Sequence, residues 1–202
     1  MTQKIIHNFG CPTLRCTWND LNNQIYVGLM DGAIKVYDTG SGQVADIGRH
    51  NSAINSLQFS SNQNILISTG YENIVNFWQP GNLSAVFSLD AGNKIYTSDC
   101  QFPTVVAATV DEKIMIVDAT NTNSRSIVDS DLGKTSQIES IALNSKGTSF
   151  GIGSFDGRAN ISNICKSLNG RYSAVIPYLN RNHRLPSRVI RKKLAIRPSS
   201  TP

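Results

Sequence analysis

The side chains that most often carry chemistry are scattered along this chain rather than grouped. Its four cysteines, Cys11, Cys16, Cys100 and Cys165, form no C-x-x-C pair, and no nearby histidine completes a zinc site. No paired carboxylates and no thiol–imidazole pair stand at a spacing typical of catalysis. The sequence therefore predicts small, buried, reduced thiols, no metal and no cofactor.

One glycine-rich segment, Gly151–Gly157 (GIGSFDG), needs inspection because such loops can cradle a phosphate group. Its third glycine comes one residue too late for the G-x-G-x-x-G pattern, and Ser154 does not fit G-x-S-x-G. A strand-like segment follows, so no helix N-terminus would face a phosphate. A turn between two strands explains these glycines, and we expect no enzyme.

The charge of the chain is divided unequally between two regions. The 202 residues carry a net charge of +5, but residues 1–165 hold 10 Lys/Arg against 14 Asp/Glu. Residues 166–202 hold nine Lys/Arg and no acid, and they end in a Pro/Ser-rich stretch. We therefore expect a basic, irregular tail, disordered or ordered by a partner from about residue 180.

The tail contains a basic run in which Arg188, Arg191, Lys192 and Lys193 are the candidate contacts. Such a run can bind nucleic acid or act as a nuclear-import signal. A solvated tail without a role is an equal alternative, because short basic runs are common.

Nothing in the sequence indicates a membrane segment or a secretory leader. The longest uncharged apolar run, residues 102–110, is about nine residues long, whereas a bilayer span needs about 20. Residues 1–8 offer no apolar core of the kind found in signal peptides. We therefore expect an intracellular protein without membrane insertion.

Four stretches share one shape: a two-residue turn, a short alternating strand, and a closing pair of residues. These are residues 31–38, 72–79, 111–118 and 156–163, whose last positions lie 41, 39 and 45 residues apart. A repeat of about 40–45 residues with several strands per unit is typical of WD-repeat β-propeller blades. The sequence predicts an all-β fold, an incomplete propeller of about four blades in an open arc over residues 1–165, followed by the basic tail.

Period-2 alternation between polar turns locates the individual strands within each repeat. We predict strands at 14–18, 24–29, 33–37, 43–47, 53–59, 64–69, 74–78, 85–89, 94–98, 104–109, 113–117, 124–128, 139–143, 150–154, 158–161 and, least regular, 172–176.

Two histidines, His7 and His50, each precede the first strand of a repeat and stand 43 residues apart. In WD-repeat proteins such a histidine commonly bonds a hydroxyl of the second strand and an acid in the next turn, with a link onward to a tryptophan. The matching set here is His50, Ser68, Glu72 and Trp78. We interpret both histidines as structural, because a general base would lack a nucleophile.

Three further landmarks resemble the WD-repeat family of mRNA-export nucleoporins. They are residues 33–54, with Ala33-Ile34-Lys35-Val36-Tyr37-Asp38 at their start, residues 94–109, and residues 151–158 with the Asp156-Gly157-Arg158 turn. The landmarks keep the family's order and spacing over about residues 10–165. A mitotic-checkpoint WD-repeat protein is a close cousin and shares the last of them.

The resemblance implies a seven-bladed propeller at the nuclear pore that shuttles to the cytoplasm. It implies binding of an acidic nucleoporin peptide, the GLEBS motif, while the cousin binds GLEBS motifs of checkpoint kinases. In both, the arginine after the turn pairs with partner glutamates, and that position is Arg158, next to Asp156. A guanidinium can fork onto a carboxylate. From the residues alone, Arg158 could equally be solvated or paired with Asp156.

The chain departs from the family mainly in blade number. About four blades are present where seven are expected, and an open arc exposes strand edges and blade faces. We therefore expect a truncated or wrongly assigned gene product, and whether another chain completes the ring stays open. The functions considered are an mRNA-export scaffold, a spindle-checkpoint adaptor, and RNA binding by the basic tail.

Overall fold

The computed structural model describes residues 7–130, 132, 137–166 and 172–177. Within these ranges the regular elements are sixteen β-strands in four antiparallel sheets. The predicted all-β fold is confirmed. In the described residues, no helix has the length and apolar character needed to cross a bilayer.

Each sheet is a meander of four strands that are consecutive in the sequence, and we number the sheets as blades 1 to 4. Blade 1 contains β1 (Thr13–Trp18), β2 (Gln24–Leu29), β3 (Ala33–Asp38) and β4 (Val44–Arg49). Blade 2 contains β5 (Ile54–Ser60), β6 (Ile65–Gly70), β7 (Ile74–Trp78) and β8 (Phe87–Asp90). Blade 3 contains β9 (Ile95–Gln101), β10 (Thr104–Thr109), β11 (Lys113–Asp118) and β12 (Asn121–Asp129). Blade 4 contains β13 (Ile138–Leu143), β14 (Ser149–Ser154), β15 (Ala159–Lys166) and β16 (Tyr172–Pro177).

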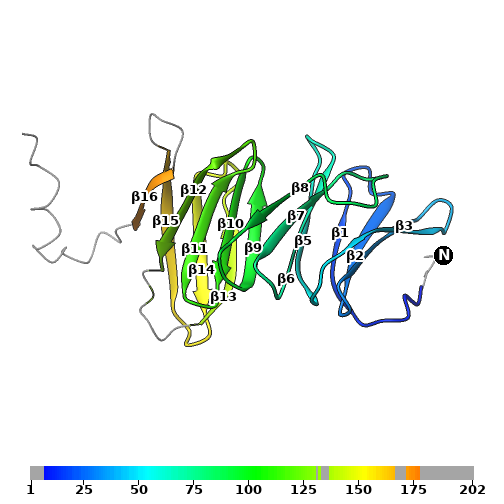
Figure 1. The fold of residues 1–202 in the computed structure, drawn as a ribbon, viewed down its shortest axis with the longest axis horizontal. Helices are drawn as coiled ribbons and strands as arrows, with labels where there is room; N and C mark the ends of the chain where they lie inside the picture. The colour runs from blue at the N-terminus through cyan, green and yellow to red at the C-terminus, as the bar shows by residue number, and fades with distance from the viewer. Residues whose placement is uncertain (1–6, 131, 133–136, 167–171, 178–202) are drawn as a thin grey trace, which may run out of the picture.

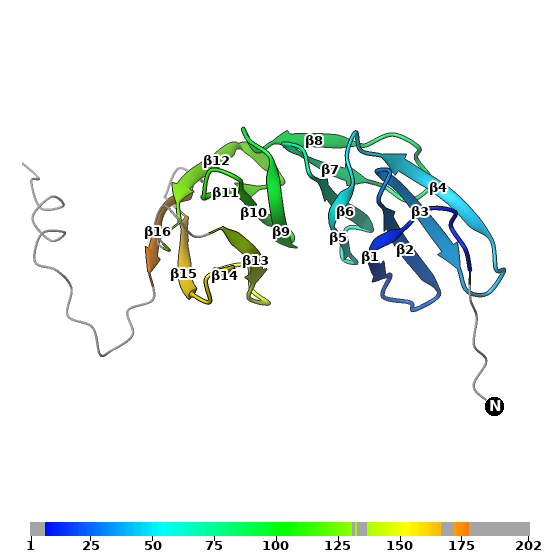
Figure 2. The same cartoon turned by 90° about the horizontal axis from the view of Figure 1, so that it is seen from below.

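The four blades stand side by side, as Figure 1 shows, and together they form an open arc (Figure 2). The first strands of the blades, β1, β5, β9 and β13, contact one another along the concave side. The last strands lie toward the convex side, so every blade runs from the inside of the arc outward. This arrangement confirms the predicted open arc of about four blades.

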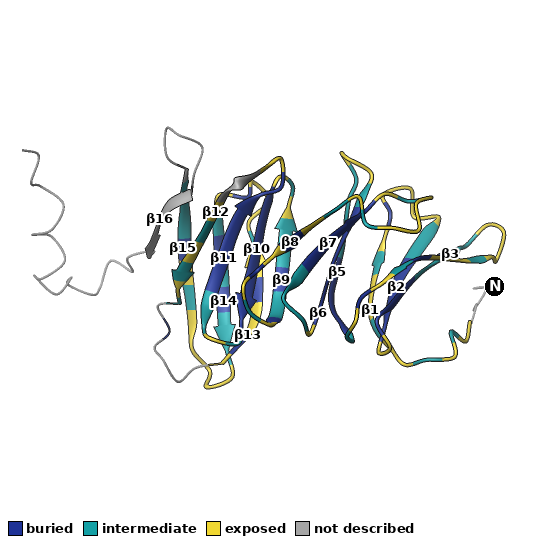
Figure 3. Cartoon of the chain, in the orientation of Figure 1, coloured by how far each residue is buried: buried dark blue, intermediate teal, exposed yellow. Residues whose placement is uncertain are grey.

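The core consists of apolar layers between adjacent blades. Side chains alternate between the two faces of a strand, so the middle strands bury residues against both neighbours, and every residue of β10 is buried (Figure 3). The layer between blades 2 and 3 includes Val75, Phe77, Val105 and Met115, each with no measurable exposure. Burying one such side chain stabilises a fold by about 1.5–3 kcal/mol.

The turn between the second and third strands is tight in every blade, and in blade 1 it requires glycine. Gly32 has a φ of +86°, and a Cβ there would lie 2.3 Å from the carbonyl oxygen of His50. Positive φ recurs at the same turn position in Glu112 and Gly157. These turns bring the acidic residues of successive blades to one rim of the arc, because all blades share the same meander.

Blade 4 extends past residue 165, where the sequence pattern suggested that the repeats end. β15 continues to Lys166, and β16 pairs with it from Tyr172 to Pro177. The backbone pairing between these strands continues the meander where the apolar alternation weakens. The basic run with Arg188, Arg191, Lys192 and Lys193, and the expected disorder from residue 180, lie outside the described residues.

Candidate functional site

The four residues expected to form a tetrad meet inside blade 2. His50 follows β4 and is 2% exposed. Its Nδ1 lies 2.5 Å from Oε1 of Glu72, and its Nε2 lies 2.7 Å from Oγ of Ser68. Nε1 of Trp78 donates to the same Ser68 oxygen at 2.7 Å. Ser68 and Trp78 come from paired strands, β6 and β7, and Glu72 comes from the turn between them.

The hydrogen bonds of this tetrad fit a neutral imidazole at His50. The indole N–H of Trp78 donates to Ser68 Oγ; with Nδ1 protonated, the ring donates to the Glu72 carboxylate and accepts from the Ser68 hydroxyl at Nε2. Every polar group is then satisfied. Burial lowers the pKa of His50, and the nearby Glu72 carboxylate opposes this shift in part. The Ser68 hydroxyl beside the ring is buried, at 1% exposure, and it also accepts from Trp78, so this Ser–His–Glu set joins the strands inside the blade rather than opening to solvent.

The tetrad positions are occupied differently in the other blades. In blade 1, His7 is exposed and its ring lies 5.4 Å from that of Tyr37, so it lacks the buried setting of His50. In blade 3 the same positions hold the buried apolar residues Ala91, Ala107 and Val117. The hydrogen-bonded tetrad is therefore complete in blade 2, whereas in blade 3 buried apolar side chains pack together at the same positions.

The acid of the turn is kept in all four blades, as Asp31, Glu72, Asp111 and Asp156. In blade 2 it bonds the histidine, whereas in the other three it pairs with a basic side chain. The separations between the paired atoms are 2.9 Å for Arg49–Asp31, 2.8 Å for Lys113–Asp111 and 2.9 Å for Arg158–Asp156. We call this edge of the arc the turn rim.

Hydrogen bonds lower the pKa values of two of the turn acids, Asp31 and Asp111. The backbone N–H of Ala33 and then the Arg49 guanidinium lower the pKa of Asp31. Lys113, followed by the Thr109 hydroxyl, lowers the pKa of Asp111. At these two positions the turn rim therefore presents an ionised carboxylate paired with a cation.

Arg158 and Asp156, the two predicted partner-binding residues, lie together at the turn rim of blade 4. Nε of Arg158 lies 2.9 Å from Oδ2 of Asp156, and its Nη1 donates to the carbonyl oxygen of Leu132 at 2.6 Å. The Ser154 hydroxyl also donates a hydrogen bond to Asp156. The Arg158 side chain remains 55% exposed, so a positioned guanidinium faces solvent.

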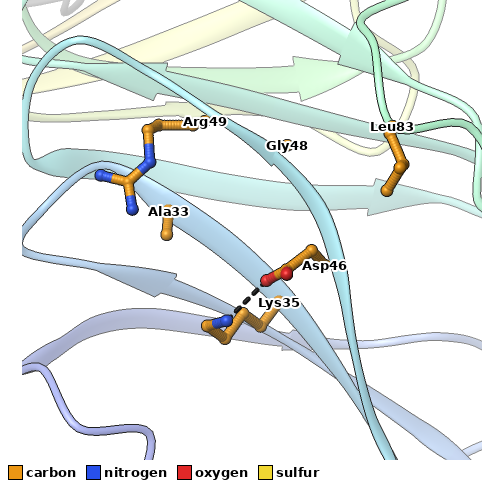
Figure 4. A pocket seen from close by; sticks show the side chains of 6 residues that line it. All are labelled: Ala33, Lys35, Asp46, Gly48, Arg49 and Leu83. Atoms are coloured by element: carbon orange, nitrogen blue, oxygen red, sulfur yellow. Dashed lines mark hydrogen bonds and ion pairs between the residues drawn. The ribbon is translucent and has the colours of Figure 1, made fainter.

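A surface pocket of about 380 Å³ opens beside β4, next to the loop between β7 and β8 (Figure 4). Its charged lining groups are already paired: Lys35 Nζ lies 2.5 Å from Asp46, and Arg49 bonds Asp31. The lining residues are Ala33, Lys35, Asp46, Gly48, Arg49 and Leu83.

Among the described residues, no cysteine forms a disulfide bond. All four are free thiols, and Cys16 is exposed, so the expectation of buried thiols is wrong there. Burial, together with the Asp99 charge, raises the pKa of Cys100 to about 12. Among the described residues, no group of three or more His, Cys, Asp or Glu could hold a metal ion.

Sequence reasoning missed the polar bonds that join neighbouring blades. The Asn55 side chain donates to the Ile95 carbonyl oxygen at 2.6 Å. Asp99 accepts from Gln58 of blade 2 at 2.6 Å and from the backbone N–H of Leu143 of blade 4 at 2.5 Å. Asn55 and Asp99 occupy different positions in their strands, so no repeated pattern marked them.

Comparison with known proteins agrees with this architecture. The family described as WD domain, G-beta repeat matches residues 42–79, the stretch that contains the complete tetrad. About three quarters of the chain superposes on the Myceliophteria thermophila Cps50 (Swd1) β-propeller domain with a TM-score of 0.66 and 20% identity, covering 54% of that domain. The chain therefore contains a WD repeat at residues 42–79 and has the fold of β-propeller blades.

Two curated relatives narrow the resemblance further. The chain is 24% identical to the Poly(A)+ RNA export protein of Schizosaccharomyces pombe, over 80% of this chain and 46% of that protein. It is 25% identical to the mitotic checkpoint protein bub-3 of Caenorhabditis elegans, over 83% of this chain and 49% of that protein. The expected resemblance to mRNA-export and mitotic-checkpoint WD-repeat proteins is confirmed. The chain spans about half the length of the curated relatives it matches.

Proposed function

We propose that this chain is a non-enzymatic WD-repeat scaffold that acts in nucleocytoplasmic mRNA export at the nuclear pore. Its proposed partner is an acidic GLEBS-type peptide of a nucleoporin, bound at the turn rim of blade 4 by Arg158. The observation that carries the proposal is the half-exposed guanidinium held between Asp156 and the Leu132 carbonyl. The export protein among the relatives supports the cellular role.

The geometry of Arg158 suits recognition of a carboxylate. A guanidinium has five N–H donors in a fixed fork, and two of them are engaged within the described part of the chain. The remaining N–H groups can bond a glutamate of a bound peptide, and a charge-assisted bond of this kind is worth about 1.5–3 kcal/mol. Because the Leu132 carbonyl already orients the side chain, less conformational entropy is lost on binding.

A spindle-checkpoint adaptor that binds checkpoint kinases through the same surface is the second candidate. The bub-3 relative supports it with nearly the same identity and coverage as the export protein. The two functions would share Arg158 and differ in the partner. Mass spectrometry of proteins that co-purify with the native chain separates them, because nucleoporins indicate export and kinases indicate the checkpoint.

The binding proposal is tested by titrating a fluorescent GLEBS peptide with the full chain and with two matched variants. Arg49 is the control for Arg158, because each pairs with its turn acid and donates to a backbone carbonyl. We expect Arg158→Gln to weaken binding roughly tenfold or more and Arg49→Gln to leave it unchanged. Equal affinity for both variants would remove the assigned role of Arg158.

A glutamate-to-glutamine version of the peptide completes the test. It should bind the unaltered chain as weakly as the original peptide binds Arg158→Gln. If the basic tail were responsible instead, binding would show a steep salt dependence and no response to either arginine variant.

A further inference from the structure

A second pocket lies at the edge of the arc opposite the turn rim, where the turns between first and second strands gather. Each second strand runs from such a turn to the turn rim, so the two kinds of turn stand at its opposite ends. The pocket holds about 230 Å³ and is lined by Asp20 of blade 1, residues 59–62 of blade 2 and residues 100–102 of blade 3. We call it the three-turn pocket.

The lengths of these turns explain why a recess forms here. In blade 3 the turn between β9 and β10 consists of residues 102–103, whereas the corresponding turns span residues 19–23 in blade 1 and 61–64 in blade 2. The longer turns extend past the shorter one and leave a hollow beside it. All the lining residues belong to the first three blades and to the described part of the chain.

The charge of the three-turn pocket is negative. No lysine or arginine is among its lining residues, and within the described part of the chain Asp20 forms no ion pair. Cys100 is a neutral thiol at physiological pH, because burial and then the Asp99 charge raise its pKa to about 12. The nearby Asp99 carboxylate therefore adds to the negative potential of Asp20, and the pocket favours a cation over a phosphate or a carboxylate.

The acceptor groups of the pocket match a guanidinium. Ser61, Asn62 and Gln101 bring a hydroxyl and two amides to the lining, and none of these side chains bonds another described residue. A guanidinium has five N–H donors in a fixed fork, which suits a carboxylate with further acceptor oxygens around it, whereas an ammonium is a compact point charge with three. Phe59 and Phe102 offer apolar surface on which the methylene stem of an arginine can pack.

The turn that carries Asp20 is held in shape before any ligand binds. The Asn19 side chain is 9% exposed and donates to the Asn23 side chain at 2.6 Å. Its oxygen accepts from the backbone N–H groups of Asn23 and Gln24, each at 3.1 Å. Less conformational entropy is therefore lost when a ligand contacts Asp20.

We propose that the three-turn pocket binds an arginine side chain of a partner protein, with the guanidinium on the Asp20 carboxylate. The volume agrees with a single side chain, because sites for whole drug-sized ligands hold about 300–1,000 Å³. Leu21 follows Asp20 in the same turn and is 80% exposed, so it offers the partner an apolar contact next to the bound arginine.

A nuclear magnetic resonance titration of the isotope-labelled full chain with capped arginine, N-acetyl-arginine methylamide, tests the pocket. We expect saturating shifts in the amide signals of Asp20, residues 60–62 and residues 100–102. Capped citrulline has the same length but an uncharged urea group, so it should bind about tenfold more weakly or worse. Capped lysine that binds as tightly as capped arginine would overturn the choice of a guanidinium.

Asp20→Asn should weaken the binding of capped arginine to the same extent, because it removes the charge and keeps the shape. Glu139→Gln is the control: it removes an exposed negative charge from β13, outside the pocket, and should leave the titration unchanged. The amide spectrum of each variant without ligand shows whether it is folded. Shifts that spread over the surface without saturating, or that are equal in the two variants, would overturn the proposal.

This proposal and the peptide site at Arg158 can fail independently. The three-turn pocket and Arg158 lie at opposite edges of the arc, so binding of the GLEBS peptide should survive Asp20→Asn. Binding of capped arginine should likewise survive Arg158→Gln.

Discussion

At the scale of single residues, His50 shows how burial and hydrogen bonding select one protonation state. Its two ring nitrogens face a hydroxyl and a carboxylate, and the Trp78 indole donates to the same Ser68 oxygen. The Glu72 charge favours the imidazolium form, but burial is the larger influence on the His50 pKa and lowers it. The turn acids without a histidine pair with arginine or lysine instead.

This setting predicts a dependence of stability on pH. The folded pKa of His50 lies below its unfolded value of 6.5, so in the interval between the two the unfolded chain binds one more proton. The free energy of unfolding should therefore fall as the pH drops below about 6.5, by at most about 1.4 kcal/mol per pH unit. Urea unfolding at several pH values between about 6.5 and 5 measures the slope.

His50→Gln serves as the control for this prediction, because it retains hydrogen-bonding groups and removes the titration. Whatever its overall stability, the slope of its free energy of unfolding against pH should be flatter in the same interval. A slope that is the same in both proteins would show that other groups cause it. The paired aspartates contribute only in more acidic solution, since their pKa values are lowered from 3.8.

At the scale of elements, the packing of β4 on β7 depends on the absence of a side chain at Gly48. The Trp78 ring lies against the Gly48 backbone, and a Cβ there would come within 2.1 Å of the ring. Neither strand can move away from this contact. The indole must stay in place to donate to Ser68, and β4 cannot shift without losing its pairing with β3.

We predict that Gly48→Ala destabilises the protein by about 1–3 kcal/mol, the usual cost of overpacking a close contact. Chemical denaturation measured by tryptophan fluorescence gives the free energy of unfolding. Gly151→Ala is the matched control, because it also adds a methyl group to a strand glycine but meets open space. A Gly48→Ala chain as stable as the control would contradict the proposed contact.

At the scale of the whole molecule, each blade contacts mainly its neighbours, so stability depends on the interfaces between blades. Asp99 contacts both neighbouring blades at once. It lies in blade 3, accepts from Gln58 of blade 2, and accepts from the Leu143 backbone of blade 4. One carboxylate therefore links three blades near the concave side of the arc.

Asp99→Ala should cost about 1–3 kcal/mol, because the backbone N–H of Leu143 loses its partner. Hydrogen exchange should become faster at Leu143 and around it in blade 4, with little change in blade 1. Asp46→Ala is the control: it removes an exposed ion pair with Lys35, and such pairs contribute about 0–1 kcal/mol. Uniform acceleration across all blades would indicate a general loss of stability instead.

Much of the fold was predictable because strand formation here is local. The predicted ranges 24–29, 74–78 and 104–109 coincide with β2, β7 and β10, since alternation and turn residues both lie within a few positions. β15 was predicted to end at residue 161 but continues to Lys166, because its pairing with β16 prolongs it. Ser162 and Asn163 break the apolar pattern there without ending the strand.

The sequence predicted which residues belong to the candidate site but not which contacts they make. The likeness to WD-repeat proteins named His50, Ser68, Glu72 and Trp78 as a set, and the resemblance to the mRNA-export family singled out Arg158. The sequence did not indicate that Arg158 bonds the Leu132 carbonyl, 26 residues away. It did not indicate that Asp99 bridges three blades either, because such bonds depend on how the sheets curve.

By itself, then, the sequence determined the strands, the repeat of about 40 residues and the acid in every turn, all of which follow from neighbouring residues. Only the tertiary structure decided which side chain pairs with each turn acid and which residues join the blades. The reason is physical: those contacts form between segments brought together by packing, and apolar layers between blades are set by register and curvature rather than by local propensity.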